Sequence, residues 1–291
     1  MHYLIAVLAP IFWGSTYSAV ALFLADLSPY WMAVWRALPA GLLMLLISRR
    51  GLPLSVPRML AVSFFNIAAF FLLLFVAAYR LPGAVAGTLG ATLPLVLMLL
   101  QWLTEGKRPQ LKMLMLALLG LAGVGLLLNP STDIDWVGAG AMLAATVFVA
   151  QSTLWMKRWE AKDIFGLTAW QLVIGGVMLI PFAWLLAGPP QAISLHAVPG
   201  LIWVIVLNTA VGYWAYIRSI TVLGPNRQSI IMFLNPLTAV TLGVLWVNET
   251  LQPMQWVGIG LILTSLVWMK WSDRGARPVV KQAVEPLPVN R

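Results

Sequence analysis

Residues 56–95 read VPRMLAVSFFNIAAFFLLLFVAAYRLPGAVAGTLGATLPL, and residues 198–237 read VPGLIWVIVLNTAVGYWAYIRSITVLGPNRQSIIMFLNPL. The two stretches align when position 56 is matched with position 198 and the following residues are paired in order. This alignment pairs Val56-Pro57 with Val198-Pro199, Asn66 with Asn208, and Pro94-Leu95 with Pro236-Leu237. Asn and Pro are uncommon in long apolar segments, so their pairing at equal depth indicates an internal repeat.

The rest of the chain extends this repeat into a series of apolar segments, each close to the roughly 20 residues that a helix needs to cross a bilayer. We place ten of them, at 4–24, 30–47, 59–79, 84–103, 111–128, 136–156, 165–186, 201–220, 228–247 and 254–271. The sequence therefore predicts an all-α integral membrane protein with ten transmembrane helices around a central cavity. Residues 1–130 and 131–271 form two five-helix repeats, and an odd number of spans per repeat inverts one relative to the other.

Lys and Arg test this count, because cytoplasmic loops retain positive charge. If the gaps are assigned alternately to the two sides of the membrane, 16 of the 18 basic residues fall on one side. Arg80 alone falls on the other side, and Arg36 lies inside the second segment. We therefore expect a multi-pass protein of the plasma membrane, specifically a bacterial inner membrane, with both termini in the cytoplasm.

The two ends of the chain carry separate predictions. The first segment could instead be a signal peptide, because Ala19-Val20-Ala21 resembles a cleavage site, but no Lys or Arg precedes it. Residues 272–291, with three prolines and mixed charge, are predicted to form a disordered cytoplasmic tail.

Composition excludes several classes of function. Hydrophobic residues make up 61% of the 291 and charged residues only 9%. This charged fraction is far below that of a soluble globular domain. The net charge of +9 acts as a topology signal, so nucleic acid is not expected as a partner. The chain has no cysteine and only two distant histidines, and we expect no metal or other cofactor. The expected partners are a small-molecule solute and the lipid bilayer, with no obligatory protein partner evident.

Several motifs resemble those of the EamA type of the drug/metabolite transporter superfamily. In the first repeat they are Phe12-Trp13-Gly14-Ser15-Thr16, Pro29, Arg36, Ala77-Ala78-Tyr79, Pro94, Glu105 and Gly120 to Gly125; in the second they are Asn235-Pro236, Glu249, Gly258 and Gly260. The second repeat departs from the pattern. It has Ala150-Gln151 near the place of the Trp-Gly pair, and Gln171 in the place that Arg36 has in the first repeat. The resemblance implies ten spans in two repeats and export of amino acids, other metabolites or drugs.

Polar and aromatic residues inside the spans are candidates for solute binding, because buried polar groups face a cavity or a neighbouring helix. Asn208 and Tyr216 lie on one helical face with Gly212, and Asn66 and Phe70 form the shorter counterpart. The full candidate set is Trp13, Tyr17, Asn66, Phe70, Thr88, Thr92, Phe148, Gln151, Trp155, Asn208, Trp214, Tyr216 and Asn235. Interhelical hydrogen bonding is the alternative role for the two asparagines. For Arg36, roughly 9 Å inside the membrane by helical rise, we weigh a structural role against a substrate contact.

Two further features concern mechanism. Pro94 and Pro236 interrupt the helical hydrogen bonds at matched depth and are candidate hinges. All nine acidic residues lie in gaps, at helix ends or in the tail, so no carboxylate inside a predicted span offers a proton relay. We therefore expect a facilitator driven by the solute gradient.

The predicted activity is export of small metabolites by alternating access. Amino acids are the favoured cargo, aromatic or hydrophobic ones above all, because the candidates are aromatic, polar and almost uncharged. The alternative is a multidrug or amphiphile/lipid exporter, which could be proton-coupled through Glu105 or Glu249. An enzyme is not expected, because no His, Cys, Asp or Glu lies within a predicted span.

Overall fold

A computed structural model describes residues 2–48, 51–78, 80–81, 83–129, 135–247 and 251–274, and all regular secondary structure in these ranges is helical. The first half contains α1 (His2–Ala6), α2 (Leu8–Gly14), α3 (Thr16–Ala19), η1 (Val20–Leu24), α4 (Pro29–Ser48), α5 (Val56–Ser63), η2 (Phe64–Ala68), α6 (Ala69–Ala78), α7 (Gly83–Gly90), α8 (Leu93–Glu105) and α9 (Leu111–Leu128). The second half contains α10 (Trp136–Trp159), α11 (Ile164–Ala187), α12 (Ala197–Ile202), η3 (Trp203–Val211), α13 (Gly212–Leu223), α14 (Pro225–Ile231), α15 (Leu234–Val247) and α16 (Pro253–Arg274). Labels with η mark π-helical segments.

Seven helical segments of the described chain are long and apolar enough to cross a membrane. They are Pro29–Ile47, Val56–Leu74, Val85–Glu105, Leu111–Leu128, Trp136–Trp159, Ile164–Ala187 and Ala197–Leu223. The first and ninth predicted spans are divided into shorter helices, among them the apolar stretch His2–Gly14. The tenth is the single helix α16, which has 22 residues but includes more polar side chains. The described residues thus form an all-helical structure with the features of a multi-pass membrane protein.

Local sequence signals explain where several helices start and stop. Asp135 and Asp163 cap α10 and α11 by accepting hydrogen bonds from the backbone N–H of Gly138 and Gly166, at 2.8 and 3.0 Å. Gly106 ends α8 with a φ of 66°, a left-handed conformation that costs glycine little.

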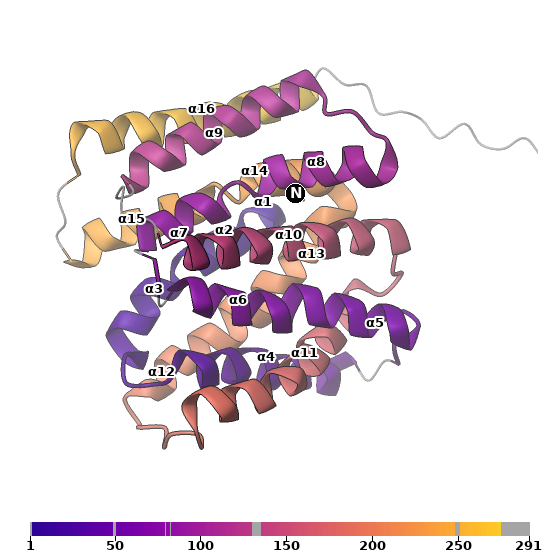
Figure 1. Cartoon of the computed structure of the whole chain (residues 1–291), viewed down its shortest axis with the longest axis vertical. Helices are drawn as coiled ribbons and strands as arrows, with labels where there is room; N and C mark the ends of the chain where they lie inside the picture. The colour runs from indigo at the N-terminus through magenta and orange to yellow at the C-terminus, as the bar shows by residue number, and fades with distance from the viewer. Residues whose placement is uncertain are drawn as a thin grey trace, which may run out of the picture.

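The helices pack in layers that run across the view of Figure 1. α9 lies beside α16 at one edge, α4 lies beside α11 at the other, and α10 contacts α6 between them. One large buried cluster joins α4, η2, α6 and α11 with η3 and α13, and a second joins α9 and α16 with α14.

Glycines bring α9 and α16 together. A Cβ added to Gly258 would lie 2.6 Å from the carbonyl oxygen of Gly123, and one added to Gly123 would lie 2.8 Å from that of Gly258. The two backbones can therefore approach only because both positions lack a side chain.

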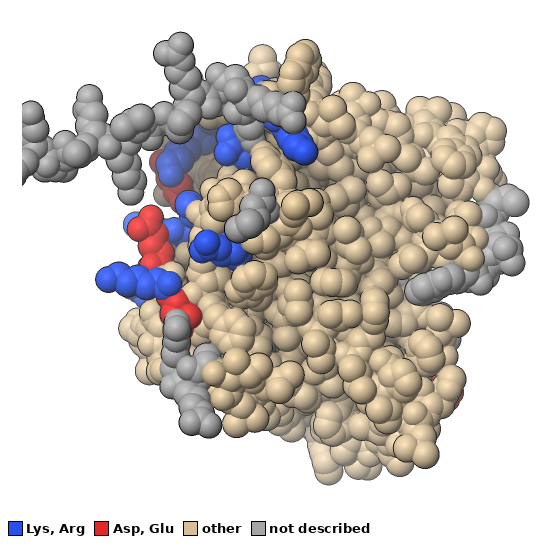
Figure 2. Space-filling view, turned by 180° about the vertical axis from the view of Figure 1, so that it is seen from behind, with Lys and Arg blue, Asp and Glu red and all other residues tan. Residues whose placement is uncertain are grey.

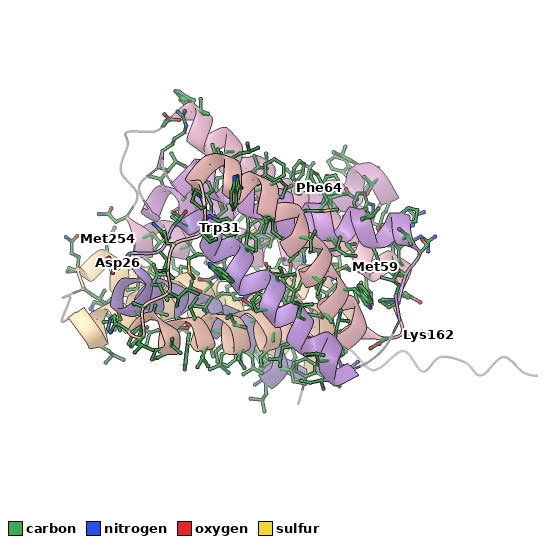
Figure 3. The ribbon with its side chains drawn as sticks, turned by 90° about the horizontal axis from the view of Figure 1, so that it is seen from below. Asp26, Trp31, Met59, Phe64, Lys162 and Met254 are labelled. Atoms are coloured by element: carbon green, nitrogen blue, oxygen red, sulfur yellow. The ribbon has the colours of Figure 1, made fainter. Side chains whose placement is uncertain are left out.

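Charged side chains gather at one end of the helices, where Figure 2 shows nearly all of the Lys and Arg in view. In Figure 3, Met59 and Lys162 lie at one end of the molecule, while Asp26 and Met254 lie at the opposite end. This arrangement agrees with the alternation of loops that the charge count assumes.

Three predictions concern residues that lie wholly or partly outside the described part of the chain. Helix α16 runs to Arg274, slightly beyond the predicted boundary at 271, and the rest of the predicted tail, 275–291, lies outside the described residues. Of the motif residues, Tyr79 and Glu249 also lie outside them. The backbone of Tyr17 belongs to α3, and its side chain is not described.

Candidate transport site

The two matched asparagines both lie in π-helical segments, Asn66 in η2 and Asn208 in η3. A π-helix hydrogen-bonds each residue to the fifth one along, which widens the turn and often marks a functional site. Both side chains are buried, with 2% of the surface of Asn66 and none of that of Asn208 exposed. The structure therefore gives these two positions the same backbone irregularity at matched places in the sequence.

The amide of Asn66 is engaged by protein on both sides. Its Nδ2 donates to Oε1 of Gln171 at 3.0 Å, and its Oδ1 accepts from the hydroxyl of Ser152 at 3.2 Å. These bonds join η2 to α11 and α10, which is the interhelical role weighed for this residue. Gln171, which stands in the second repeat's motif pattern where Arg36 stands in the first, belongs to this network.

Asn208 is engaged differently. Its Nδ2 donates to the hydroxyl of Thr16 at 2.6 Å, and its backbone carbonyl accepts from Nε1 of Trp13 at 2.7 Å. Its Oδ1 is buried and has no hydrogen-bond partner among the described residues. A buried acceptor left in this state costs free energy unless a solute or water donates to it.

Aromatic rings surround Trp13 beside Asn208. The ring centroids of Tyr213 and Tyr216 lie 4.9 and 5.3 Å from that of Trp13. The hydroxyl of Tyr216 lies 3.0 Å from that of Thr153 on α10. The structure thus brings together three of the candidates, Trp13, Asn208 and Tyr216, and adds Tyr213, which the sequence reasoning missed.

A second aromatic group follows one face of α10. Phe65 of η2 packs edge-on against Phe148 and Trp155, with centroid distances of 4.8 and 5.2 Å. Trp155 stacks on Trp159 at 5.4 Å, and the guanidinium of Arg58 lies 5.4 Å from the Trp159 ring. Phe148 and Trp155 therefore share a row as the helical spacing predicts, and Gln151 lies between them in the sequence.

The remaining candidates lie around these two groups. Phe70 and Trp214 pack against the cluster that contains Tyr213. Asn235 places its backbone carbonyl against Gly14, where an added Cβ would lie 2.6 Å from that oxygen. The hydroxyl of Thr92 donates to the carbonyl of Leu89 at 2.6 Å, and Thr88 lies on α7.

Pro94 and Pro236 both follow interruptions of the helix. Residues 91–92 separate α7 from α8, and residues 232–233 separate α14 from α15. Proline has no N–H for the carbonyl four residues earlier, at Gly90 and Met232, and the helices end at or next to these residues. The breaks are established, whereas motion about them stays a prediction.

Arg36 of α4 faces the same region. Its Nε donates to the hydroxyl oxygen of Thr209 at 3.3 Å, and its guanidinium lies 5.0 Å from the ring centroid of Phe71. Thr209 is the residue after Asn208 and is fully buried. Among the described residues, no group of three His, Cys, Asp or Glu side chains could hold a metal ion.

Comparison with known proteins decides the family. The model of the EamA-like transporter family matches this chain twice, at residues 1–129 and 136–271. The chain belongs to the EamA-like transporter family. It is therefore a membrane transporter, consistent with its apolar helices.

Three similar proteins match most of the chain, and two of them, YwfM and YedA, carry transporter names. Protein PecM of Dickeya dadantii is 31% identical over 89% of each chain. Transporter YwfM of Bacillus subtilis is 26% identical, covering 94% of this chain and 95% of its own. Inner membrane transporter YedA of Escherichia coli K12 is 27% identical, covering 94% and 93%.

A solved crystal structure shares the fold of this EamA-like transporter. The two superpose with a TM-score of 0.79 at 15% sequence identity, over 94% of this chain and 97% of that one. At this level of identity, the likeness concerns the fold alone.

Proposed function

We propose that this transporter exports small metabolites, amino acids above all and aromatic or hydrophobic ones in particular. The observation that carries this proposal is the group formed by Trp13, Asn208, Tyr213 and Tyr216. It combines closely packed, tilted aromatic rings with a buried amide oxygen that has no partner among the described residues. An apolar wall with a few fixed polar groups is typical of small-molecule sites.

We infer that the solute crosses by alternating access between two inverted five-helix repeats, within ten spans. Two matched irregularities support this: the π-helical turns at Asn66 and Asn208, and the helix breaks before Pro94 and Pro236. The double match to the family model supports the same division. Inverted repeats provide two related states, one open to each side of the membrane.

The proposed location is a bacterial inner membrane with both termini in the cytoplasm. Its support is the collection of Lys and Arg at one end of the helices, together with the inner-membrane name of YedA. The charge pattern sets the orientation, because positively charged loops stay in the cytoplasm.

The proposed driving force is the solute gradient itself. The described acidic residues lie at helix ends or between helices: Asp135 and Asp163 are N-caps, and Glu105, the last residue of α8, pairs with Lys107 at 2.6 Å. None of these positions resembles a proton relay inside the bilayer. We expect uptake into proteoliposomes to be the same with and without an imposed pH gradient; strict dependence on that gradient would establish proton coupling instead.

A flux screen in proteoliposomes tests the proposed cargo. Labelled aromatic amino acids are expected to cross faster than nucleosides or cationic dyes. Asn208→Ala and Gln151→Ala are expected to lower this flux, while Thr264→Ala, on the exposed face of α16, serves as the matched control. Normal flux in both site variants, in protein that folds normally, would contradict the proposed site.

A further inference from the structure

Arg36 is a charged residue inside an otherwise uncharged helix. It is the eighth of the 20 residues of α4, and no other Lys, Arg, Asp or Glu occurs in that helix. Placing a guanidinium within the bilayer costs several kcal/mol or more, so such residues are retained mainly for function.

The contacts of Arg36 fix the direction of its guanidinium. The hydroxyl of Thr209 donates its own proton to the carbonyl of Val204 at 2.7 Å, so its oxygen is the acceptor for Nε of Arg36. The ring of Phe71 lies 5.0 Å from the guanidinium, a cation–π distance. A partner on each of two different helical segments positions the group across the helix interface.

This guanidinium is next to the proposed transport site. Thr209 and Asn208 are consecutive in η3, and Trp13 donates to the carbonyl of Asn208. Phe71 and Tyr213 belong to the same buried cluster, against which Trp13 packs. The guanidinium of Arg36, the buried side-chain oxygen Oδ1 of Asn208 and a wall of aromatic rings thus occupy one region.

We propose that Arg36 binds the carboxylate of the transported solute, which makes a free carboxylate a requirement for recognition. This assignment rests on the proposed transport of amino acids and adds the group that distinguishes them. The planar guanidinium can hold a carboxylate through two parallel N–H donors. The Oδ1 of Asn208 accepts from the α-ammonium group, and the rings of Trp13 and Tyr213 contact the side chain of the solute.

Competition by chemical analogues tests the assignment in the unmodified protein. Proteoliposomes take up labelled phenylalanine in the presence of unlabelled phenylalanine, phenylalaninamide or 3-phenylpropionate. Phenylalaninamide keeps the ring and the ammonium group but lacks the carboxylate, and we expect it to compete about tenfold or more weakly than phenylalanine. 3-Phenylpropionate keeps the carboxylate and is expected to compete better than the amide.

Variants of Arg36 then separate recognition from structure. Arg36→Gln is expected to weaken competition by phenylalanine and to leave that by the amide unchanged, so the difference between the two disappears. Arg36→Lys keeps the charge and should restore part of the difference. Arg158→Gln, an exposed arginine near the end of α10, is the control and should behave like the unmodified protein.

Three results would overturn the assignment. Equal competition by phenylalanine and its amide in the unmodified protein would overturn the role of Arg36 and leave the proposed transport of amino acids intact. This result needs no variant, so it holds even if Arg36→Gln fails to fold. If Arg36→Gln weakens competition by both compounds equally, Arg36 has a structural role. Absence of saturable uptake for any amino acid would overturn the proposed function together with this assignment.

Discussion

Asn66 holds three helical segments together through Gln171 and Ser152. Replacing it with alanine leaves two buried polar groups without this partner. We expect Asn66→Ala to reduce the free energy of unfolding by about 1–3 kcal/mol. Thermal unfolding in detergent measures this, and Gln151→Ala, which removes an amide from a half-buried position on α10, should shift the transition much less. Equal shifts in the two variants would refute the structural role of Asn66.

The residues of the Asn208 group show how far the sequence predicts a site. Helical spacing places Asn208 and Tyr216 on one face, and both lie beside Trp13. The same spacing does not indicate Tyr213, because η3 widens the turn just before it and changes the angle between successive side chains. Neither the spacing nor the types of residues 203–211 predict a π-helical segment.

Prolines illustrate the same limit at the level of elements. Helices α1, α7 and α14 end at or next to the residue four before Pro10, Pro94 and Pro236. Pro39 and Pro181, in contrast, lie within the unbroken helices α4 and α11. A proline removes one hydrogen bond at either kind of position, and the surrounding helices decide whether the helix ends. The sequence therefore predicts weak points, but it does not predict that the first and ninth spans divide.

The α9–α16 pair gives a stability prediction for an element. Gly258→Ala would place its Cβ against backbone atoms of α9 and force the helices apart, so we expect a lower unfolding temperature. Gly260→Ala is the matched control on the same helix, because nothing lies within 4 Å of its added Cβ. An unchanged unfolding temperature in Gly258→Ala would show that the close contact is absent.

The start of α10 carries a pH-dependent contribution. The pKa of the Asp135 carboxyl is lowered from 3.8, first by the hydrogen bond from the Gly138 N–H and also by the charge of Arg80, 3.3 Å away. A group with a lowered folded-state pKa stabilises the fold above its unfolded-state pKa and loses that effect as pH falls through the folded-state value.

Asp135→Asn should therefore unfold at a lower temperature than the unmodified protein at pH 7. The difference should shrink as the pH falls below about 4, where the unmodified carboxyl becomes protonated. Thermal melts of both proteins from pH 7 to pH 3 measure this, and a constant difference across that range would refute it.

The topology of the whole molecule can be tested with single cysteines, because the chain contains none. Asp26 and Lys162 lie at opposite ends of the molecule in Figure 3, and both are exposed. A membrane-impermeant maleimide should label Asp26→Cys in right-side-out vesicles and Lys162→Cys only after the vesicles are opened. Labelling of both from the same side would contradict the proposed orientation and the count of spans between them.

Counterflow tests most directly the claim that this molecule is an alternating-access carrier. Proteoliposomes are loaded with unlabelled phenylalanine and diluted into a trace of the labelled amino acid. A carrier exchanges one for the other, so we predict transient accumulation of label above its equilibrium level. Uptake that only approaches equilibrium, or that equals uptake by protein-free liposomes, would contradict the account.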